Sequence, residues 1–227
     1  MKPLGILGGT FDPIHFGHLR LAQELATGLG LGEVCFIPSG RPPHRAEPDV
    51  PAAHRLEMVR LGVFGNPLFT LDPREIHKPD PSYTVETLAE LRRDLGPKQP
   101  LCLLMGTDAF LGLATWHRWQ ELFGLAHIAV AQRPGVSSLT RAAATMPVEL
   151  RDALNHRLTH EPEALHSAPA GAIIVQAITA LDISATRIRE QVRSGESPRY
   201  LLPGAVLDYI ETHRLYENPD PARVQGE

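Results

Sequence analysis

Residues 8–18 read GGTFDPIHFGH, and this stretch decides the fold. A short apolar run at residues 4–7 precedes it, and an amphipathic run follows at 19–29. A buried strand, a glycine turn and a helix, in that order, open a parallel β-α-β unit. Gly8 and Gly9 allow the backbone to turn tightly and to approach a ligand closely. The stretch therefore predicts a ligand site at the end of the first strand.

Two histidines follow the glycines, and their spacing is informative. If the helix reaches back to His15, then His15 and His18 share one helix face, and Gly17 leaves room above that face. Asp12 and Pro13 resemble a helix cap followed by a first-turn proline. The N–H groups and dipole at a helix N-terminus favour anions, so the pattern indicates a phosphate site. The fragment H-x-G-H alone would suit a glycine turn with two surface histidines equally well.

Composition limits the classes of protein to consider. The chain has 227 residues, 43% of them hydrophobic, with 22 basic and 26 acidic residues and a net charge of −4. We expect one domain over residues 1–227, with a helical part from about 184 and a flexible tail at 217–227. This charge balance indicates neither a nucleic-acid nor a membrane partner. The oligomeric state is left open.

The apolar runs, the first residues and the two cysteines predict a cytoplasmic protein. No apolar run approaches the roughly 20 residues of a membrane span, and the first residues lack the charged and apolar regions of a signal peptide. Cys35 and Cys102 lie in separate apolar runs, so buried free thiols are expected rather than a disulfide or a metal pair.

Apolar runs and helical periodicity alternate along the chain. Strands are predicted at 4–7, 33–38, 68–71, 74–77, 101–105, 127–131 and 172–175. Helices are predicted at 19–29, 52–64, 84–95, after 108 with an interruption at 115–119, from 184 onward and at 204–214. Thr84 is the predicted cap of its helix, and 134–147 is expected to be a flexible excursion. The fold class is therefore α/β, a doubly wound, Rossmann-like parallel sheet with helices on both faces.

The polar segments follow the strands of this sheet. They are 8–18, 39–45, 82–84, 106–108, 133 and 184–189. Ligands of doubly wound sheets bind at the carboxyl ends of the strands, near the switch point of the strand order. We therefore expect these segments to form one site.

The last of these segments has its own anion-binding character. Ser184, Thr186 and Arg189 place hydroxyls and a guanidinium near the start of a helix, and the arginine fork suits polyphosphate. Taken alone, residues 184–189 would more often be a capped surface helix.

Together, the motifs resemble a known family. GGTFDPIHFGH and ISATRIR (183–189) resemble two signature elements of the H-x-G-H nucleotidyltransferases. The segments PPHR (42–45), PSYT (81–84), GTD (106–108), TW (115–116) and RP (133–134) resemble the bacterial nicotinate-nucleotide adenylyltransferases. The resemblance covers about residues 4–216 in the family's order. It implies the nucleotidyltransferase type of fold and a reaction in NAD biosynthesis, in which ATP and nicotinate mononucleotide give deamido-NAD and pyrophosphate.

The resemblance also implies roles on the ATP side. His15, His18 and Arg189 are the expected catalytic residues, with His18 acting on the transition state. The expected ATP-binding residues are Gly8, Gly9, Thr10, Phe11, His15, His18, Ser184, Thr186 and Arg189. Mg²⁺ would arrive with ATP, held by phosphates and water rather than by a protein metal site. Because the acceptor phosphate is already an anion, the site must align two polyanions rather than deprotonate a nucleophile.

On the acceptor side, the ring of Trp116 would stack on the pyridine, and backbone N–H groups of Thr84 and His117 would meet the carboxylate. Asp108 would bind a ribose hydroxyl. The expected phosphate ligands are His44, Arg45 and Arg133, although Arg133 could contact ATP instead. The remaining histidines match no site element, and they are His54, His77, His127, His156, His160, His166 and His213.

Three alternatives remain open. The acceptor could be nicotinamide mononucleotide, which differs by one charge, or phosphopantetheine, although that family is usually shorter and lacks the SYT and TW elements. A non-catalytic nucleotide-binding module would be expected to lack His18 or Arg189, and both are present. A metal hydrolase would need clustered ligands, which the scattered histidines do not supply.

Overall fold

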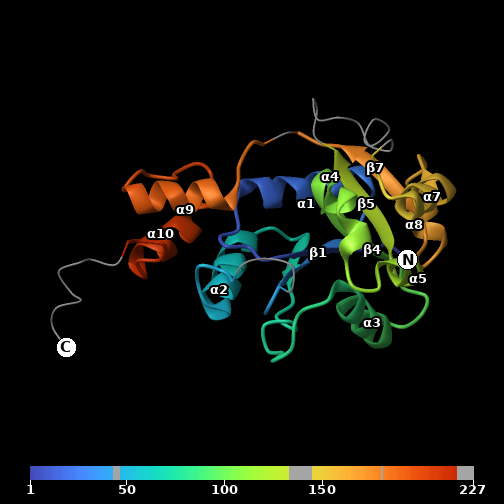
Figure 1. Cartoon of the computed structure of the whole chain (residues 1–227), viewed down its shortest axis with the longest axis horizontal. Coiled ribbons are helices and arrows are strands. Elements are labelled where there is room, and N and C mark those ends of the chain that lie inside the picture. Colours follow the sequence, from blue (N-terminus) through green and yellow to red (C-terminus); the bar gives the residue numbers. More distant parts are fainter. Residues whose placement is uncertain (43–46, 133–144, 180, 219–227) are drawn as a thin grey trace.

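The structure is a computed structural model that describes residues 1–42, 47–132, 145–179 and 181–218. Its centre is a seven-stranded sheet in the order β3-β2-β1-β4-β5-β7-β6, and every neighbouring pair is parallel (Figure 1). The strands are β1 (Leu4–Gly9), β2 (Glu33–Pro38), β3 (Phe69–Leu71), β4 (Leu101–Gly106), β5 (His127–Gln132), β6 (Leu158–Thr159) and β7 (Ile173–Ala177).

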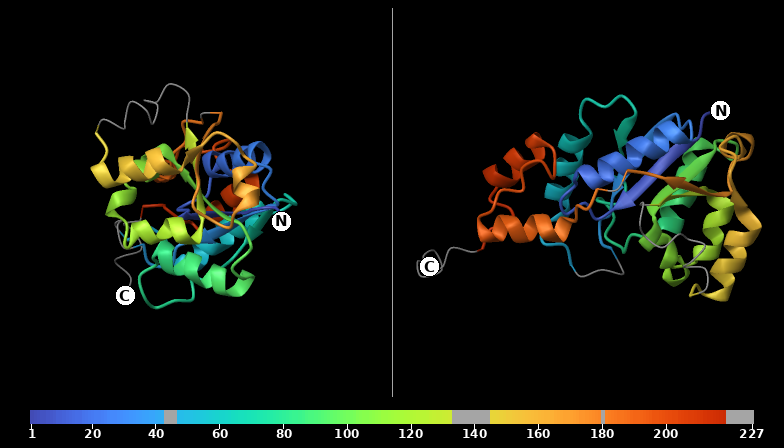
Figure 2. Two further views of the ribbon diagram at one scale, coloured as in Figure 1. Left: turned by 90° about the vertical axis from the view of Figure 1, so that its right-hand side faces the viewer. Right: turned by 90° about the horizontal axis from the view of Figure 1, so that it is seen from above.

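Helices cover both faces of this sheet, as Figure 2 shows from two further sides. The α-helices are α1 (Phe16–Gly28), α2 (Ala52–Val63), α3 (Thr84–Leu95), α4 (Thr107–Leu111), α5 (Leu122–Leu125), α7 (Val148–Arg157), α8 (Ala164–Ser167), α9 (Ala185–Ser194) and α10 (Gly204–Thr212). Two 3-10 turns are η1 (Leu113–Thr115) and η2 (Trp119–Glu121). The doubly wound α/β prediction is confirmed.

Alternation along the strands builds a core on each face. In β2, Val34 and Phe36 belong to one apolar cluster, whereas Cys35 and Ile37 belong to the other. The first cluster packs the sheet against α1, α2 and α10, and the second packs it against α3, α4, α5 and α7. Because successive strand residues point to opposite faces, a continuous apolar run is what a sheet covered on both faces requires.

The switch point of the strand order lies at β1. This strand pairs with β2 along its whole length, from Leu4 to Gly9. It pairs with β4 only from Leu4 to Ile6, so the carboxyl-terminal halves of β1 and β4 separate. Such a parting is where ligands of doubly wound sheets bind. The two strands that part are followed by the segments 8–18 and 106–108.

Two predictions about helix starts are wrong. The helix α1 begins at Phe16 with His15 as its N-cap, so Asp12 and Pro13, joined by a cis peptide, lie outside it. The Asp12 carboxylate is instead used in long-range hydrogen bonds, as described below. The N-cap of α3 is Tyr83, and Thr84 is the first helical residue. No side chain caps this helix.

The predicted strand at 74–77 is also wrong, because these residues form turns. The Asp72 carboxylate accepts hydrogen bonds from the N–H of Arg74 (2.9 Å) and from its guanidinium (2.7 Å). An aspartate that bonds to the backbone two residues later favours a turn over a strand. Helix α7 and the edge strand β6 were not predicted, since α7 buries only Leu150 and Leu154.

Both cysteines are free and buried, as predicted. Burial raises the pKa of each thiol to about 12, so neither is a reactive thiolate at neutral pH. None of the helices in the described ranges combines the length and apolar character needed to cross a bilayer. The predicted flexible segment and tail lie outside the described residues over 133–144 and 219–227.

Candidate active site

The turn after β1 is shaped by a buried aromatic side chain. Phe11 has a left-handed backbone (φ 50°) and is 2% exposed, with its ring against His18 (5.1 Å between centroids) and Phe36 (5.9 Å). A Cβ on Gly9 would lie 3.0 Å from that ring, which explains the glycine. Since the Phe11 side chain faces the core, its backbone is the part that remains available at the turn.

The two histidines stack where α1 begins. Their ring centroids are 3.8 Å apart with an interplanar angle of 23°, so the prediction that His15 and His18 share a face is confirmed. The N–H of His15 donates to Nδ1 of His18 (3.3 Å). That bond fixes Nδ1 as an acceptor, and in the neutral ring the proton therefore sits on Nε2 as a donor. A Cβ on Gly17 would lie 2.9 Å from the His15 ring, so the glycine makes room for this ring.

The start of α9 lies against the same turn. Ser184 is the N-cap, and its Oγ accepts a hydrogen bond from the N–H of Arg187 (3.2 Å). Arg189 donates from Nη1 to the carbonyl oxygen of Asp12 (2.8 Å) and forms an ion pair with Asp49. Arg193, one turn further along, also pairs with Asp49 (2.6 Å). The structure thus brings together residues 8–18 and 184–189, while Thr186 is exposed at the helix start.

Asp12 joins this arrangement to the end of the described chain. Its buried carboxylate accepts hydrogen bonds from the N–H of Asp49 (2.8 Å) and the hydroxyl of Tyr216 (2.6 Å). Burial and the Asp12 charge raise the pKa of the Tyr216 phenol, which stays protonated as a donor. Asp12, Asp49 and Tyr216 could not be predicted as a unit, because nothing local in the sequence marks contacts so far apart.

Replacing Tyr216 with phenylalanine tests this hub. The change keeps the ring and removes the donor to a buried carboxylate, which is expected to lower the free energy of unfolding by about 1.5–3 kcal/mol. Urea denaturation of wild type and variant measures the difference. The matched control is Tyr209→Phe, whose hydroxyl bonds to His54 (3.0 Å) at a less buried place and should cost about 1 kcal/mol or less. Equal losses in the two variants would contradict a special role for the Asp12 contact.

Two of the predicted acceptor segments meet at the starts of α3 and η2. The rings of Tyr83 and His117 lie 4.4 Å apart, which places the segment 81–84 beside 115–117. Trp116 is half-buried against the second apolar cluster. Asp108 is exposed in the first turn of α4, directly after β4. His44, Arg45 and Arg133 lie outside the described residues.

A buried arginine beneath the site was not predicted to be functional. Arg55 of α2 is 1% exposed, and its guanidinium bonds to carbonyl oxygens of Thr10, Ser39 and Gly40. A signal was present, since Arg55 lies one helical turn before Val59 on the apolar face of the predicted helix.

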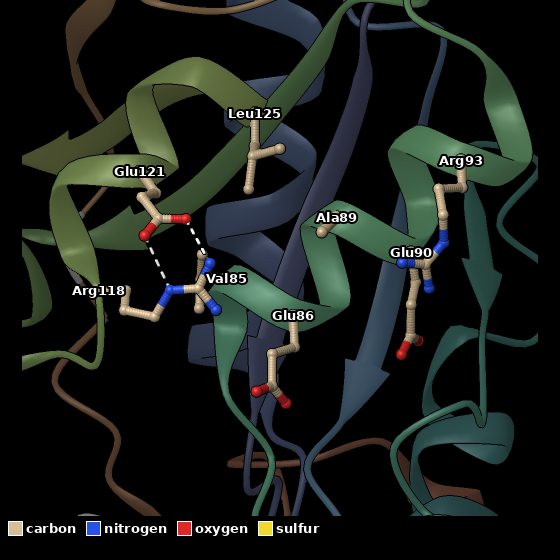
Figure 3. Close-up of a pocket in the computed structure, with 8 residues that line it drawn as sticks. All are labelled: Val85, Glu86, Ala89, Glu90, Arg93, Arg118, Glu121 and Leu125. Atoms are coloured by element: carbon tan, nitrogen blue, oxygen red, sulfur yellow. Dashed lines mark hydrogen bonds and ion pairs between the residues drawn. The ribbon is translucent and has the colours of Figure 1, made fainter.

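A surface pocket close to the acceptor segments is a separate feature. It measures about 430 Å³ and lies between the outer side of α3 and the Arg118–Leu125 region (Figure 3). Arg118 is paired there with Glu121 at 2.5 and 2.8 Å. None of the motif residues of either half of the site lines it. Within the described ranges, no group of three or more His, Cys, Asp or Glu side chains is placed to hold a metal ion.

Fold and site together define a class of protein. A parallel sheet whose switch point carries a glycine turn, with a stacked histidine pair and a helix-borne arginine beside it, is the kind of fold and site that binds nucleotide phosphates. The sequence matches the Cytidylyltransferase-like family over residues 6–191.

Proteins of similar sequence identify the family within this class. A probable nicotinate-nucleotide adenylyltransferase of Dechloromonas aromatica is 54% identical over 217 residues, covering 96% of this chain and 99% of the relative. One of Halorhodospira halophila is 50% identical, covering 96% and 97%. The chain belongs to the nicotinate-nucleotide adenylyltransferase family. The fold also resembles that of the Plasmodium falciparum nicotinic acid mononucleotide adenylyltransferase complexed with NaAD, with a TM-score of 0.70, 16% identity and coverage of 95% and 98%.

Proposed function

We propose that this chain transfers the adenylyl group of ATP to the phosphate of nicotinate mononucleotide, giving deamido-NAD and pyrophosphate in NAD biosynthesis. The observation that carries the proposal is the stacked His15–His18 pair at the start of α1, together with Arg189, which donates to the Asp12 carbonyl oxygen in the turn after β1. We also propose that the reaction takes place in the cytoplasm.

The chemistry needs alignment and charge stabilisation rather than a base. The acceptor phosphate is an anion at neutral pH, and the leaving pyrophosphate gains charge in the transition state. Nε2 of His18 is the donor that the His15 N–H leaves protonated, so we assign it to the phosphate at the reacting centre. His15, stacked beneath it, contacts the same phosphate chain.

The other residues of the ATP half contact different phosphates of the nucleotide. Gly8 and Gly9 permit close approach of the phosphates, and backbone groups of Thr10 and Phe11 contact the α-phosphate. Arg189 holds the β- and γ-phosphates, helped by Ser184 and Thr186. Asp49 forms an ion pair with Arg189. The phosphates of ATP therefore have to share or replace this carboxylate.

ATP is taken as its Mg²⁺ complex. The described side chains offer no cluster of three metal ligands, and Mg²⁺ keeps phosphate oxygens and waters as ligands more readily than most ions. The ion neutralises phosphate charge when bound. The chain's own residues position the nucleotide around it.

The acceptor lies over Trp116 in this proposal. Backbone N–H groups of Thr84 and His117 bind the carboxylate, and the ring of His117 contacts that of Tyr83, the residue before Thr84. Asp108 binds a ribose hydroxyl. His44, Arg45 and Arg133 hold the acceptor phosphate.

The test is pyrophosphate release from Mg-ATP with three acceptors in parallel: nicotinate mononucleotide, nicotinamide mononucleotide and phosphopantetheine. Fast release with the acid alone supports the proposal and places specificity in the carboxylate contacts. Comparable release with acid and amide would replace it with a dual-specificity enzyme. ATP binding without release from any acceptor would contradict the reaction and favour a nucleotide-binding module.

Replacing Trp116 with alanine should weaken the acceptor selectively. Loss of a stacking surface is expected to raise the KM for nicotinate mononucleotide by the equivalent of about 1–3 kcal/mol, while the KM for ATP stays unchanged. Steady-state kinetics with each substrate varied in turn measures both. Trp116→Phe is the matched control, because it keeps an aromatic face. An alanine variant with an unchanged acceptor KM would remove Trp116 from the acceptor site.

A further inference from the structure

Arg55 joins the carboxyl ends of two neighbouring strands. Its Nη1 donates to the carbonyl oxygen of Thr10 (2.8 Å), in the turn after β1, and to that of Ser39 (2.7 Å), directly after β2. Its Nη2 donates to the carbonyl oxygen of Gly40 (3.0 Å). A planar guanidinium can hold three carbonyls at once in a fixed arrangement, which a lysine cannot. Arg55 therefore ties the two turns together beyond the backbone hydrogen bond from the Ser39 N–H to the Gly9 carbonyl oxygen (2.8 Å).

Because Arg55 is buried, its guanidinium must keep its hydrogen-bond partners. With Arg55 1% exposed, burial lowers the pKa of its guanidinium, while the nearby Asp12 charge opposes that shift. A buried cation that loses its hydrogen-bond partners is strongly unfavourable. The carbonyls of Thr10, Ser39 and Gly40 are thus held in place, because moving any of them away would leave charge unsatisfied.

The turn after β2 continues this connection to the acceptor segment. The N–H groups of Gly40 (3.1 Å) and Arg41 (3.4 Å) donate to Oγ of Ser82, and the N–H of Ser82 donates to the carbonyl oxygen of Arg41 (2.9 Å). Ser82 precedes Tyr83 and Thr84, where α3 begins. The loop at 39–42 therefore lies between Arg55 and the acceptor segment and is bonded to both.

This loop has little freedom to adjust. A Cβ on Gly40 would lie 2.2 Å from the carbonyl oxygen of Glu75, so the backbone is in close contact there. The Glu75 side chain is buried beneath the loop and accepts hydrogen bonds from the hydroxyls of Thr87 (2.6 Å) and Ser82. A displacement of residues 39–40 must consequently be transmitted to Ser82 rather than absorbed.

We propose that Arg55 is a positioning residue that couples the two halves of the site. Through Thr10 it sets the nucleotide-phosphate turn, and through Ser39, Gly40 and Ser82 it sets the acceptor segment. A shift of either turn on substrate binding is passed through these hydrogen bonds to the other turn, so binding of either substrate favours binding of the other. The inference rests on the proposed division of the site into an ATP half and an acceptor half. Arg55 itself touches neither substrate.

The test measures coupling rather than activity alone. Titration calorimetry gives the affinity of the α,β-methylene analogue of ATP with and without nicotinate mononucleotide, and the affinity of the acceptor with and without the analogue. Coupling between sites is reciprocal, so both comparisons must give the same factor. Wild type is expected to show a factor above about 5, a usual size for coupled sites. A factor of one in wild type would overturn the inference.

Three variants locate the coupling. Ser82→Ala is expected to weaken the acceptor by about tenfold, as loss of a hydrogen bond does, and to leave the analogue's affinity without acceptor unchanged. Arg55→Met is expected to weaken both ligands and abolish the coupling, and Arg55→Lys to restore part of it. The control Met58→Leu, fully buried in the same helix, should leave the coupling factor intact.

The outcomes separate this inference from the proposed function. A coupling factor equal to that of wild type in both Arg55→Met and Ser82→Ala would overturn the inference, while pyrophosphate release with nicotinate mononucleotide would still uphold the proposed function. If Arg55→Met does not fold, Ser82→Ala and Arg55→Lys decide the question, because the inference predicts a smaller coupling factor than wild type in both variants and an unchanged factor in both would overturn it. Absence of pyrophosphate release in wild type would instead overturn the proposed function.

Discussion

Replacing His18 with alanine is expected to lower kcat by about 10²–10³-fold, the usual loss when one preorganised donor to transition-state charge is removed. The KM for nicotinate mononucleotide should change little, because the acceptor contacts come from other elements. The physical reason is the hydrogen bond from the His15 N–H to Nδ1 of His18. It holds the ring in place and leaves Nε2 as a donor before the substrate arrives. Steady-state pyrophosphate release measures both constants.

A matched control separates this effect from loss of packing. His54 also bonds through Nδ1, in this case to the Tyr209 hydroxyl, but it lies on α2 away from the turn. His54→Ala should leave kcat unchanged. His18→Ala must retain the wild-type circular dichroism spectrum for its kcat to be interpreted, since the ring also stacks on His15 and contacts Phe11. Turnover equal to wild type in His18→Ala would remove His18 from the mechanism.

Much of the fold follows from local patterns. Continuous apolar runs predict the strands β1, β2, β4, β5 and β7, since a strand covered on both faces has no polar side. The failures have local causes too. Residues 74–77 look extended, yet the Asp72 carboxylate bonds back to Arg74 and makes a turn. The two-residue strand β6 has no pattern of its own and exists because β7 offers it an edge.

The site, like the fold, has parts that the sequence predicts and parts that it does not. The meeting of segments 8–18 and 184–189 could be predicted, because both carry residue types that suit phosphate and both follow strands of one sheet. The residues that hold them could not. Tyr216 is 204 residues from its partner Asp12 along the chain, and Arg55 is 45 residues from Thr10. An arginine in an amphipathic helix usually faces solvent, and only the folded chain shows that three carbonyls surround this one.

Arg189 provides the second large expected effect. Arg189→Lys keeps the positive charge but loses the planar fork that spans two phosphate oxygens. We expect kcat/KM for ATP to fall by at least about 10²-fold, in the range seen when a donor to transition-state charge is lost. The loss should appear when ATP is varied and not in binding of nicotinate mononucleotide alone. Steady-state kinetics and acceptor titration measure the two effects separately.

Arg193→Ala is the control that decides what the loss means. Arg193 shares the Asp49 carboxylate with Arg189 but is the more exposed of the two, and an exposed ion pair contributes about 0–1 kcal/mol. If the Arg189 guanidinium acts on phosphate, Arg193→Ala changes kcat/KM by about fivefold or less. If both variants lose activity equally, the functional element is the Asp49 clamp that orients α9. In that case Asp49→Asn should reproduce the loss, whereas an Arg189 that acts directly on phosphate would bind ATP more readily once the competing carboxylate charge is gone.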